Sequence, residues 1–103
     1  MNKREIMNLA WQFVRLNGFN RSEALKQAWL NARLRGAMKE RIVKFYYQKV
    51  DGSMREAYGT LAERLTPATL GTGRRTNVTV QTYYDSEVQD WRCYKKANLV
   101  KIV

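Results

Sequence analysis

The sequence predicts an α+β protein in which a helical hairpin at residues 1–38 precedes a small five-stranded β-barrel at residues 41–103. Apolar residues recur at helical spacing in the first part of the chain and alternate with polar residues in the second. The chain has 103 residues, of which 45% are hydrophobic and only one is a proline. A chain of this size and composition folds around a small core, so collagen-like, low-complexity and wholly disordered proteins are excluded.

The first predicted helix presents one broad apolar face. Its members at helical spacing are Ile6, Leu9, Ala10, Phe13 and Leu16, and Met7, Trp11 and Val14 widen the face. A polar stripe that contains Gln12 and Arg15 lies opposite. Gly18 follows as a C-cap, because glycine readily adopts the left-handed conformation that ends a helix.

The second predicted helix begins near Asn20 and ends at Gly36. Asn20 and Glu23 resemble a capping box in which Asn replaces Ser or Thr. The residues expected on the buried face are Leu25, Ala28, Trp29 and Ala32, and those expected to face solvent are Lys26 and Arg33. This helix repeats the first at a period of 18 residues, so Trp29 corresponds to Trp11. We expect the two tryptophans to anchor the hairpin to the barrel or to a partner.

The second part of the chain has the period of β-strands. The predicted strands cover residues 42–48, 54–61, 78–84, 91–95 and 99–103, with one 3₁₀ turn at 96–98. Asp51-Gly52 predicts a tight hairpin turn between the first two strands. Five strands this short are typical of a small barrel, which removes the exposed edges of an open sheet.

The chain is strongly basic. Its 19 Lys and Arg residues against 9 Asp and Glu residues give a formal net charge of +10, divided equally (+5 and +5) between residues 1–40 and 41–103. A basic surface attracts polyanions, because each contact of a Lys or Arg with a phosphate releases condensed counterions. We therefore expect nucleic acid or an acidic partner, rather than a charge that serves solubility alone.

The residue types argue against catalysis and against a metal or cofactor. The chain lacks histidine, the commonest metal ligand, and its single cysteine, Cys93, excludes an internal disulfide and a cysteine-based zinc site. Asp85, Glu87 and Asp90 share one predicted turn and could bind a cation weakly, although turns favour Asp for backbone reasons alone. No apolar run is long enough to span a membrane, and the lone thiol suits a reducing compartment. We expect a cytoplasmic protein that is not an enzyme.

The best candidate site is the glycine- and arginine-rich stretch Gly71-Thr72-Gly73-Arg74-Arg75. Gly71 and Gly73 would let backbone N–H groups turn toward an anion, and Arg74 and Arg75 would add bidentate contacts to phosphate. The stretch lacks the Lys-Ser/Thr ending of a P-loop, which argues against nucleotide hydrolysis. A hairpin loop with solvated arginines explains the same residues equally well.

Aromatic and basic residues are interleaved along the third and fourth predicted strands. Tyr83 and Tyr84 must face opposite sides of the sheet; one packs inward, and the other, for which Tyr84 is our candidate, is free to stack on a base or a partner. Trp91 is expected in the core, whereas Arg92 faces away from it and extends a basic strip with the lysines that follow. The candidate binding residues are Tyr84, Arg92, Lys95 and Lys96, and the secondary candidate surface on the second helix contains Lys26 and Arg33.

Several motifs in the second part of the chain occur together in one known family. They are Phe45, Tyr47, Asp51-Gly52, Arg55, Gly59-Thr60, Pro67, Gly71-Thr72-Gly73-Arg74, Gln81-Thr82-Tyr83-Tyr84-Asp85, Trp91-Arg92 and Asn98-Leu99. The region that contains them, residues 43–102, resembles the WYL-like, Sm-like SH3 β-barrel domains of unknown function found in phages and mobile elements. Ser22-Glu23-Ala24-Leu25-Lys26 with Ala28-Trp29 resembles the helical leader of such barrels. The resemblance implies an SH3-like barrel and, through distant similarity to WYL domains, the sensing of a ligand or nucleic acid; it implies no established activity.

Two hypotheses follow for the function. The first is a non-enzymatic module that contacts RNA or single-stranded nucleic acid through the barrel, and it rests on the net charge, the Gly-Arg stretch and the interleaved aromatic residues. The second, which the resemblance to phage proteins implies, is an inhibitor that binds a host nucleic-acid-guided defence nuclease, such as a CRISPR effector, or its RNA. Trp11, Trp29 and Tyr84 would be its anchors. Composition does not separate the two hypotheses.

Overall fold

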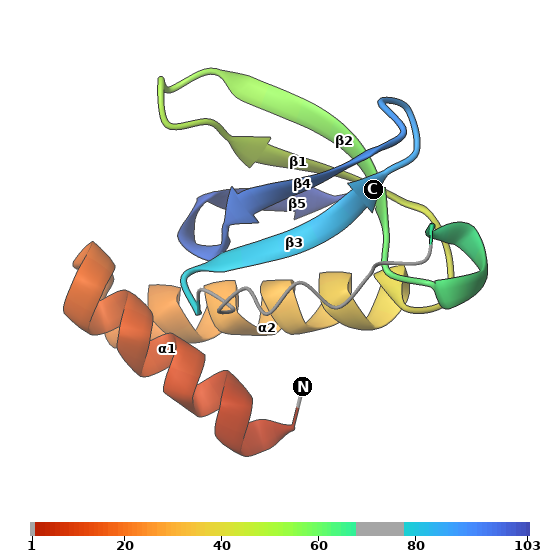
Figure 1. Cartoon of the computed structure of the whole chain (residues 1–103). Coiled ribbons are helices and arrows are strands. Elements are labelled where there is room, and N and C mark those ends of the chain that lie inside the picture. Colours follow the sequence, from red (N-terminus) through yellow and green to blue (C-terminus); the bar gives the residue numbers. More distant parts are fainter. Residues whose placement is uncertain (1, 68–77) are drawn as a thin grey trace.

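The computed structural model describes residues 2–67 and 78–103. Its elements in chain order are α1 (Lys3–Asn17), α2 (Arg21–Met38), β1 (Val43–Gln48), β2 (Met54–Thr60), the 3₁₀ turn η1 (Glu63–Leu65), β3 (Val80–Asp85), β4 (Asp90–Lys95), the 3₁₀ turn η2 (Lys96–Asn98) and β5 (Leu99–Ile102). Helix α2 runs beneath the curved sheet, and α1 packs against α2 (Figure 1). The predicted order of a helical hairpin followed by five strands is confirmed, as is the predicted 3₁₀ turn at 96–98. The turn η1 was not predicted.

Both helices begin and connect as their local residues predict. The Asn2 side chain accepts a hydrogen bond from the backbone N–H of Glu5 (2.9 Å), and Gly18 ends α1 in the left-handed conformation, with φ of 70°. In α2, the Asn20 side chain accepts from the backbone N–H of Glu23 (2.8 Å) and donates to the Glu23 carboxylate (2.9 Å). The predicted caps at Gly18 and Asn20 are therefore confirmed, whereas the cap at Asn2 was not predicted.

Helix α2 continues two residues beyond its predicted end at Gly36. The last turn is held by tertiary contacts, since the Met38 side chain is fully buried in the barrel core. The Met38 carbonyl accepts hydrogen bonds from the Thr60 hydroxyl (3.0 Å) and the backbone N–H of Leu61 (2.8 Å). Residues at the end of β2 thus donate the hydrogen bonds that a carbonyl at the C-terminus of α2 needs. In other helices a glycine cap provides such donors.

The interior of the hairpin combines three large apolar side chains with three alanines. Its buried residues are Ile6, Leu9, Ala10, Phe13, Ala24 and Ala28. Leu25 and Trp29, which we expected to be buried, are exposed, and so is Leu16. The reason is that α2 turns Ala28 toward α1 and directs Leu34 and Met38 into the barrel, which leaves its Leu25–Trp29 stripe on the outside.

The sheet is antiparallel with the strand order β4-β3-β2-β1-β5. Six residue pairs join β1 to β2, whereas only Gly59↔Asp85 and Thr60↔Tyr84 join β2 to β3. Strand β2 therefore pairs with β1 along its length and with β3 only at its end, as expected when a sheet curls into a barrel.

Aromatic rings fill the barrel. The buried cluster contains Leu34, Met38, Val43, Phe45, Tyr47, Ala57, Tyr83, Tyr94 and Leu99. The rings of Phe45 and Tyr83 meet edge to face, with centroids 5.2 Å apart. Gly59 permits this contact, because a Cβ atom at that position would lie 2.6 Å from Cδ2 of Tyr83.

A buried polar network joins α2 to the turn between β4 and β5. The amide of Asn31 donates to the Lys96 carbonyl (2.9 Å), and the amide of Gln27 donates to the carbonyls of Lys96 (2.9 Å) and Leu99 (2.8 Å). The Tyr94 hydroxyl donates to Oδ1 of Asn31 (3.1 Å). These directional bonds fix α2 against η2, so the hairpin and the barrel are held in one arrangement. Within residues 2–67 and 78–103, neither helix has the length and hydropathy needed to cross a membrane.

Candidate nucleic-acid interface

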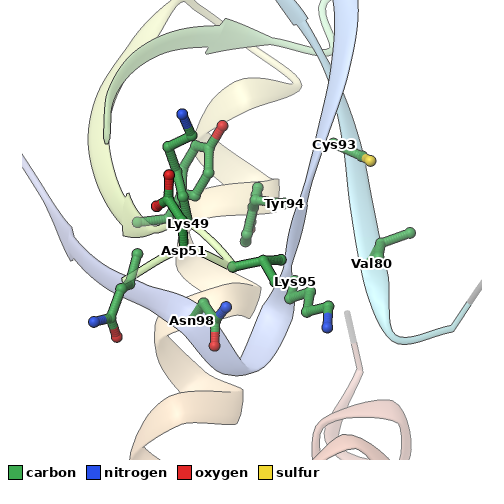
Figure 2. A pocket seen from close by; sticks show the side chains of 10 residues that line it. Lys49, Asp51, Val80, Cys93, Tyr94, Lys95 and Asn98 are labelled. Atoms are coloured by element: carbon green, nitrogen blue, oxygen red, sulfur yellow. The ribbon is translucent and has the colours of Figure 1, made fainter. Parts of the chain in front are cut away.

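A cavity of about 580 Å³ opens between the β1–β2 turn and the end of β4. Its lining residues are Tyr47, Gln48, Lys49, Val50, Asp51, Val80, Cys93, Tyr94, Lys95 and Asn98. We call it the barrel cavity; Figure 2 shows Tyr94 at its centre, with Lys49 and Asp51 on one side and Lys95 on another. Its volume falls within the range of small-ligand sites, which is about 300–1,000 Å³.

The floor of the barrel cavity is aromatic. The rings of Tyr47 and Tyr94 are stacked, with centroids 5.4 Å apart and an interplanar angle of 28°. Both hydroxyls are engaged inside the protein, that of Tyr94 by Asn31 and that of Tyr47 by the hydroxyl of Tyr83 (3.2 Å). Burial raises the pKa of Tyr94 well above its ordinary value, so this ring stays neutral. Tyr47 and Tyr94 are only 7% and 3% exposed, so their rings close the bottom of the cavity with carbon atoms and belong mainly to the barrel core.

The rim of the barrel cavity is polar and carries a positive charge. Lys49 and Lys95 are exposed, and neither forms an ion pair, because Lys44–Glu56 (3.6 Å) is the one ion pair within the described residues. Oδ1 of Asp51 accepts hydrogen bonds from the Ser53 hydroxyl (2.6 Å) and backbone N–H (2.9 Å), and these bonds, aided by the charge of Lys49, lower the pKa of Asp51.

Asn98 adds an amide to the same rim. Its side chain makes no hydrogen bond within residues 2–67 and 78–103, although it lines the cavity. An amide both donates and accepts, so it can read the polar edge of a ligand ring. The rim thus offers two ammonium groups, one amide and one ionised carboxylate around the aromatic floor.

Of the predicted basic strip, only Lys95 lines the barrel cavity. Arg92 pairs with Tyr83 across the β3–β4 ladder and lies three residues from Lys95, so strand alternation places them on opposite faces. Lys96 is half-buried beside the helices, where burial and the nearby charge of Arg35 lower its pKa. The structure does not bring the three basic residues together on one surface.

Tyr84 lies on the outer face of the sheet and Tyr83 is fully buried, which settles the choice between the two tyrosines. Tyr84 pairs with Trp91, and their rings meet edge to face with centroids 5.5 Å apart. The expectation that Trp91 belongs to the core is wrong: alternation places Trp91 beside Tyr84, and Tyr94 is the aromatic residue that β4 contributes to the core.

The remaining predicted site residues lie elsewhere. Gly71, Gly73, Arg74 and Arg75 lie outside the described residues, so their role stays a prediction. Lys26 and Arg33 are exposed on α2 and border a hollow of the hairpin.

A second aromatic and basic surface was missed in the sequence. Lys44, Tyr46, Glu56, Tyr58 and Lys101 lie together on the outer face of β1, β2 and β5. The Tyr58 hydroxyl donates to Glu56 (2.6 Å) and lowers the pKa of that carboxyl, while the ammonium groups of Lys44 and Lys101 lie 5.7 and 5.0 Å from the ring centroid of Tyr46. The signal was available, because Phe45 and Tyr47 facing inward requires residues 44 and 46 to face outward. These side chains already pair with one another through hydrogen bonds, an ion pair and cation–π contacts, so we do not place the binding site here.

The barrel cavity was also missed, since only Lys95 among its rim residues was a candidate. The described residues contain no group of three or more His, Cys, Asp or Glu placed to hold a metal ion. Asp85 is buried, and its Oδ1 accepts the backbone N–H groups of Glu87 (2.9 Å) and Val88 (3.3 Å), which is the work of a turn residue.

One protein family matches this chain. The family described as WYL_2, Sm-like SH3 beta-barrel fold matches residues 31–100, from the second half of α2 to the start of β5. No curated protein and no solved structure matches the sequence. The match covers more than half of the chain, and the observed sheet order and α2 packing agree with a barrel of this kind. The chain therefore belongs to the WYL_2 family of Sm-like SH3 β-barrels.

Proposed function

We propose that this protein is a non-enzymatic module that binds single-stranded nucleic acid, RNA in the first place, through the barrel cavity. The observation that carries the proposal is a cavity lined by two aromatic residues, Tyr47 and Tyr94, and by two lysines, Lys49 and Lys95, that have no ion-pair partner within the described residues. Aromatic platforms flanked by basic side chains are the usual construction of sequence-tolerant single-strand sites.

The charge of the whole chain supports a polyanionic ligand. The net charge is +10, and the one ion pair of the described residues uses only Lys44. Most basic side chains there are consequently available to phosphates. Binding to phosphate releases counterions, so the affinity should fall steeply with salt concentration.

The cavity favours a single strand over a duplex. A base that enters it must leave its stack, and this costs least when the base is already unpaired. In the proposed complex the base enters the cavity above the small exposed parts of Tyr47 and Tyr94, the Asn98 amide contacts its polar edge, and Lys49 and Lys95 contact the adjacent phosphates.

The test is a fluorescence anisotropy titration with labelled single-stranded RNA, single-stranded DNA and duplex RNA at several salt concentrations. Lys49→Ala with Lys95→Ala should weaken the binding of the single strands and flatten the log–log salt slope by about 1.4 units, since each phosphate contact contributes about 0.7. The matched control is Lys3→Ala with Lys39→Ala, which removes the same charge from exposed sites away from the cavity. Equal losses in both variants, or no binding at about 50 mM salt, would refute the proposal.

The same titration tests the sequence-based prediction for the Gly-Arg stretch. Arg74→Ala with Arg75→Ala should flatten the slope by a similar amount if both arginines contact phosphate. An unchanged slope would remove this stretch from the binding surface without affecting the proposal for the barrel cavity.

We propose, as the second candidate, an inhibitor that acts on a host nucleic-acid-guided defence nuclease by binding the effector protein or its RNA. The half-exposed Trp11 and Trp29 favour it, since tryptophan is enriched at the centres of protein interfaces. Its test is a pull-down from host lysate with and without nuclease treatment. One stoichiometric nuclease partner that remains after RNA removal, and whose cleavage activity this protein inhibits, would support it; partners that all vanish with RNA would exclude a direct protein contact.

A further inference from the structure

The outer face of the helical hairpin carries an uncovered apolar surface. Four large side chains on it are each exposed by between 38% and 47%: Met7, Trp11, Leu25 and Trp29. Both helices contribute, and the two tryptophans occupy equivalent positions of the 18-residue repeat. Monomeric proteins rarely leave several large apolar side chains exposed side by side unless the surface is used.

Two hollows shape this surface, and they meet at Leu25. The first has a volume of about 290 Å³ and is lined by Met7, Ala10, Trp11, Val14, Arg21, Ala24 and Leu25. The second has a volume of about 550 Å³ and is lined by Ser22, Leu25, Lys26, Gln27, Trp29, Leu30 and Arg33. Since Leu25 lines both, the two hollows are neighbours on the hairpin surface, and we call the pair the hairpin trough.

The charged groups that line the hairpin trough are all positive. They are Arg21, whose guanidinium carbon lies 5.6 Å from the centroid of the Trp11 ring, Lys26 and Arg33. No Asp or Glu lines either hollow, and none of these three cations has an ion pair within the described residues. The trough therefore combines an apolar floor with an uncompensated positive rim.

We propose that the hairpin trough docks an acidic amphipathic helix of a partner protein. The apolar side chains of that helix would fill the hollows beside Trp11 and Trp29, and its carboxylates would pair with Arg21, Lys26 and Arg33. Helices that recognise a groove place apolar anchors at positions i, i+3, i+4 and i+7, and burial from water strengthens the ion pairs at the edges.

Charge and floor chemistry argue against the other occupants. A second copy of this chain would bring a net charge of +10 and the same three cations against this rim, so self-association is disfavoured. Nucleic acid would suit the rim and could stack on Trp11 and Trp29, but Met7 and Leu25 extend the floor with aliphatic side chains, which the apolar anchors of a helix fill better than bases do.

The probe is a displayed library of helical peptides of about 18 residues, the length of α2, with apolar residues fixed at i, i+3, i+4 and i+7 and all other positions randomised. The full chain is the target. Selected peptides should be acidic, and Trp11→Ala with Trp29→Ala should weaken their binding at least about tenfold, as expected for interface hot spots. Lys26→Glu with Arg33→Glu should do the same, whereas the control Lys49→Glu with Lys95→Glu should not.

Three results would overturn the proposal. The first is a selection that enriches no peptide, or only neutral and basic ones. The second is a set of peptides that bind the tryptophan double variant as tightly as the parent. The third is a parent protein that sediments as a dimer, when the tryptophan double variant does not. A loss of single-stranded RNA binding in that variant, as large as the loss of peptide binding, would assign the trough to nucleic acid instead. The two proposals can fail separately, because the peptide test depends on Trp11, Trp29, Lys26 and Arg33, and Lys49 and Lys95 serve there only as the control.

Discussion

The barrel buries a cluster of large aromatic rings, whereas the hairpin buries Phe13 and leaves its two tryptophans on the surface. In the barrel, Phe45 and Tyr83 are fully buried and Tyr94 is only 3% exposed, whereas in the hairpin Trp11 and Trp29 are 46% and 47% exposed. The hairpin packs its helices through Ile6, Leu9, Phe13 and three alanines, so its tryptophans contribute little to the contact between α1 and α2. The comparison teaches that the barrel depends on its aromatic side chains for stability, while the hairpin keeps its largest ones available for contacts with other molecules.

Truncating one aromatic residue in each region tests whether the barrel depends more on its aromatic side chains than the hairpin does. Phe45→Ala should lower the free energy of unfolding by about 3–5 kcal/mol, because it removes a fully buried ring that touches Tyr47, Tyr83 and Tyr94. Trp29→Ala should cost less than about 1 kcal/mol. Urea unfolding followed by circular dichroism measures both values. A similar cost in the two variants would show that the hairpin also needs its exposed aromatics.

The network between the two regions should carry the next largest effect. Asn31→Leu removes the donor to the Lys96 carbonyl and the acceptor of the Tyr94 hydroxyl, so we expect a loss of about 2–3 kcal/mol. Asn8→Leu, at an exposed position of α1, is the control and should change stability by less than about 0.5 kcal/mol. If Asn31→Leu were neutral, packing alone would hold α2 against the barrel.

Local sequence patterns predicted the parts of the fold that depend on neighbours in the chain. The caps at Gly18 and Asn20 need only residues within one helical turn, and the hairpin turn at Asp51-Gly52 needs only its own two residues. The strand period also required Tyr83 and Tyr84 to face opposite sides. Which of them faced inward depended on the pairing of β3 with β2 and β4, and that choice also decided the place of Trp91.

The barrel cavity could not be read from the sequence, because its floor joins residues that are far apart in the chain. Tyr47 and Tyr94 come from β1 and β4, and these strands do not pair with each other. The outer surface of α2 was misjudged for a related reason. Leu25 and Trp29 fit an apolar helical stripe, but η2 and α1 cover the stripe that contains Ala24, Ala28 and Asn31 instead.

Adding one methyl group in each region sharpens the comparison. Gly59→Ala should cost about 1–3 kcal/mol, because the new Cβ atom would lie 2.6 Å from Cδ2 of Tyr83 and 2.9 Å from Cε1 of Phe45. Gly36→Ala should instead stabilise the protein by about 0.5–1 kcal/mol, because that position is helical and nothing lies within 4 Å of the added atom. Thermal melts of the two variants should shift in opposite directions. A destabilised Gly36→Ala variant would mean that α2 is distorted at that turn.

The smallest expected effect is a pH dependence of stability that comes from the barrel, because the hairpin contains no tyrosine. Burial raises the pKa of Tyr94 in the folded barrel above the ordinary value of 10.0, whereas the unfolded chain ionises this tyrosine near 10. The unfolded state therefore loses a proton first, and the stabilisation that is fully present below pH 10 declines as the pH rises above it.

At pH 10.5 the loss should be about 0.8 kcal/mol relative to pH 7. Tyr94→Phe should reduce the fall in the free energy of unfolding between pH 9.5 and 10.5, measured by urea titrations, by about 0.7 kcal/mol. Because Tyr94→Phe also removes the hydrogen bond to Asn31, its stability at pH 7 will change as well, and the slope is the decisive quantity. A slope identical to that of the parent would mean that the Tyr94 hydroxyl reaches solvent through the barrel cavity.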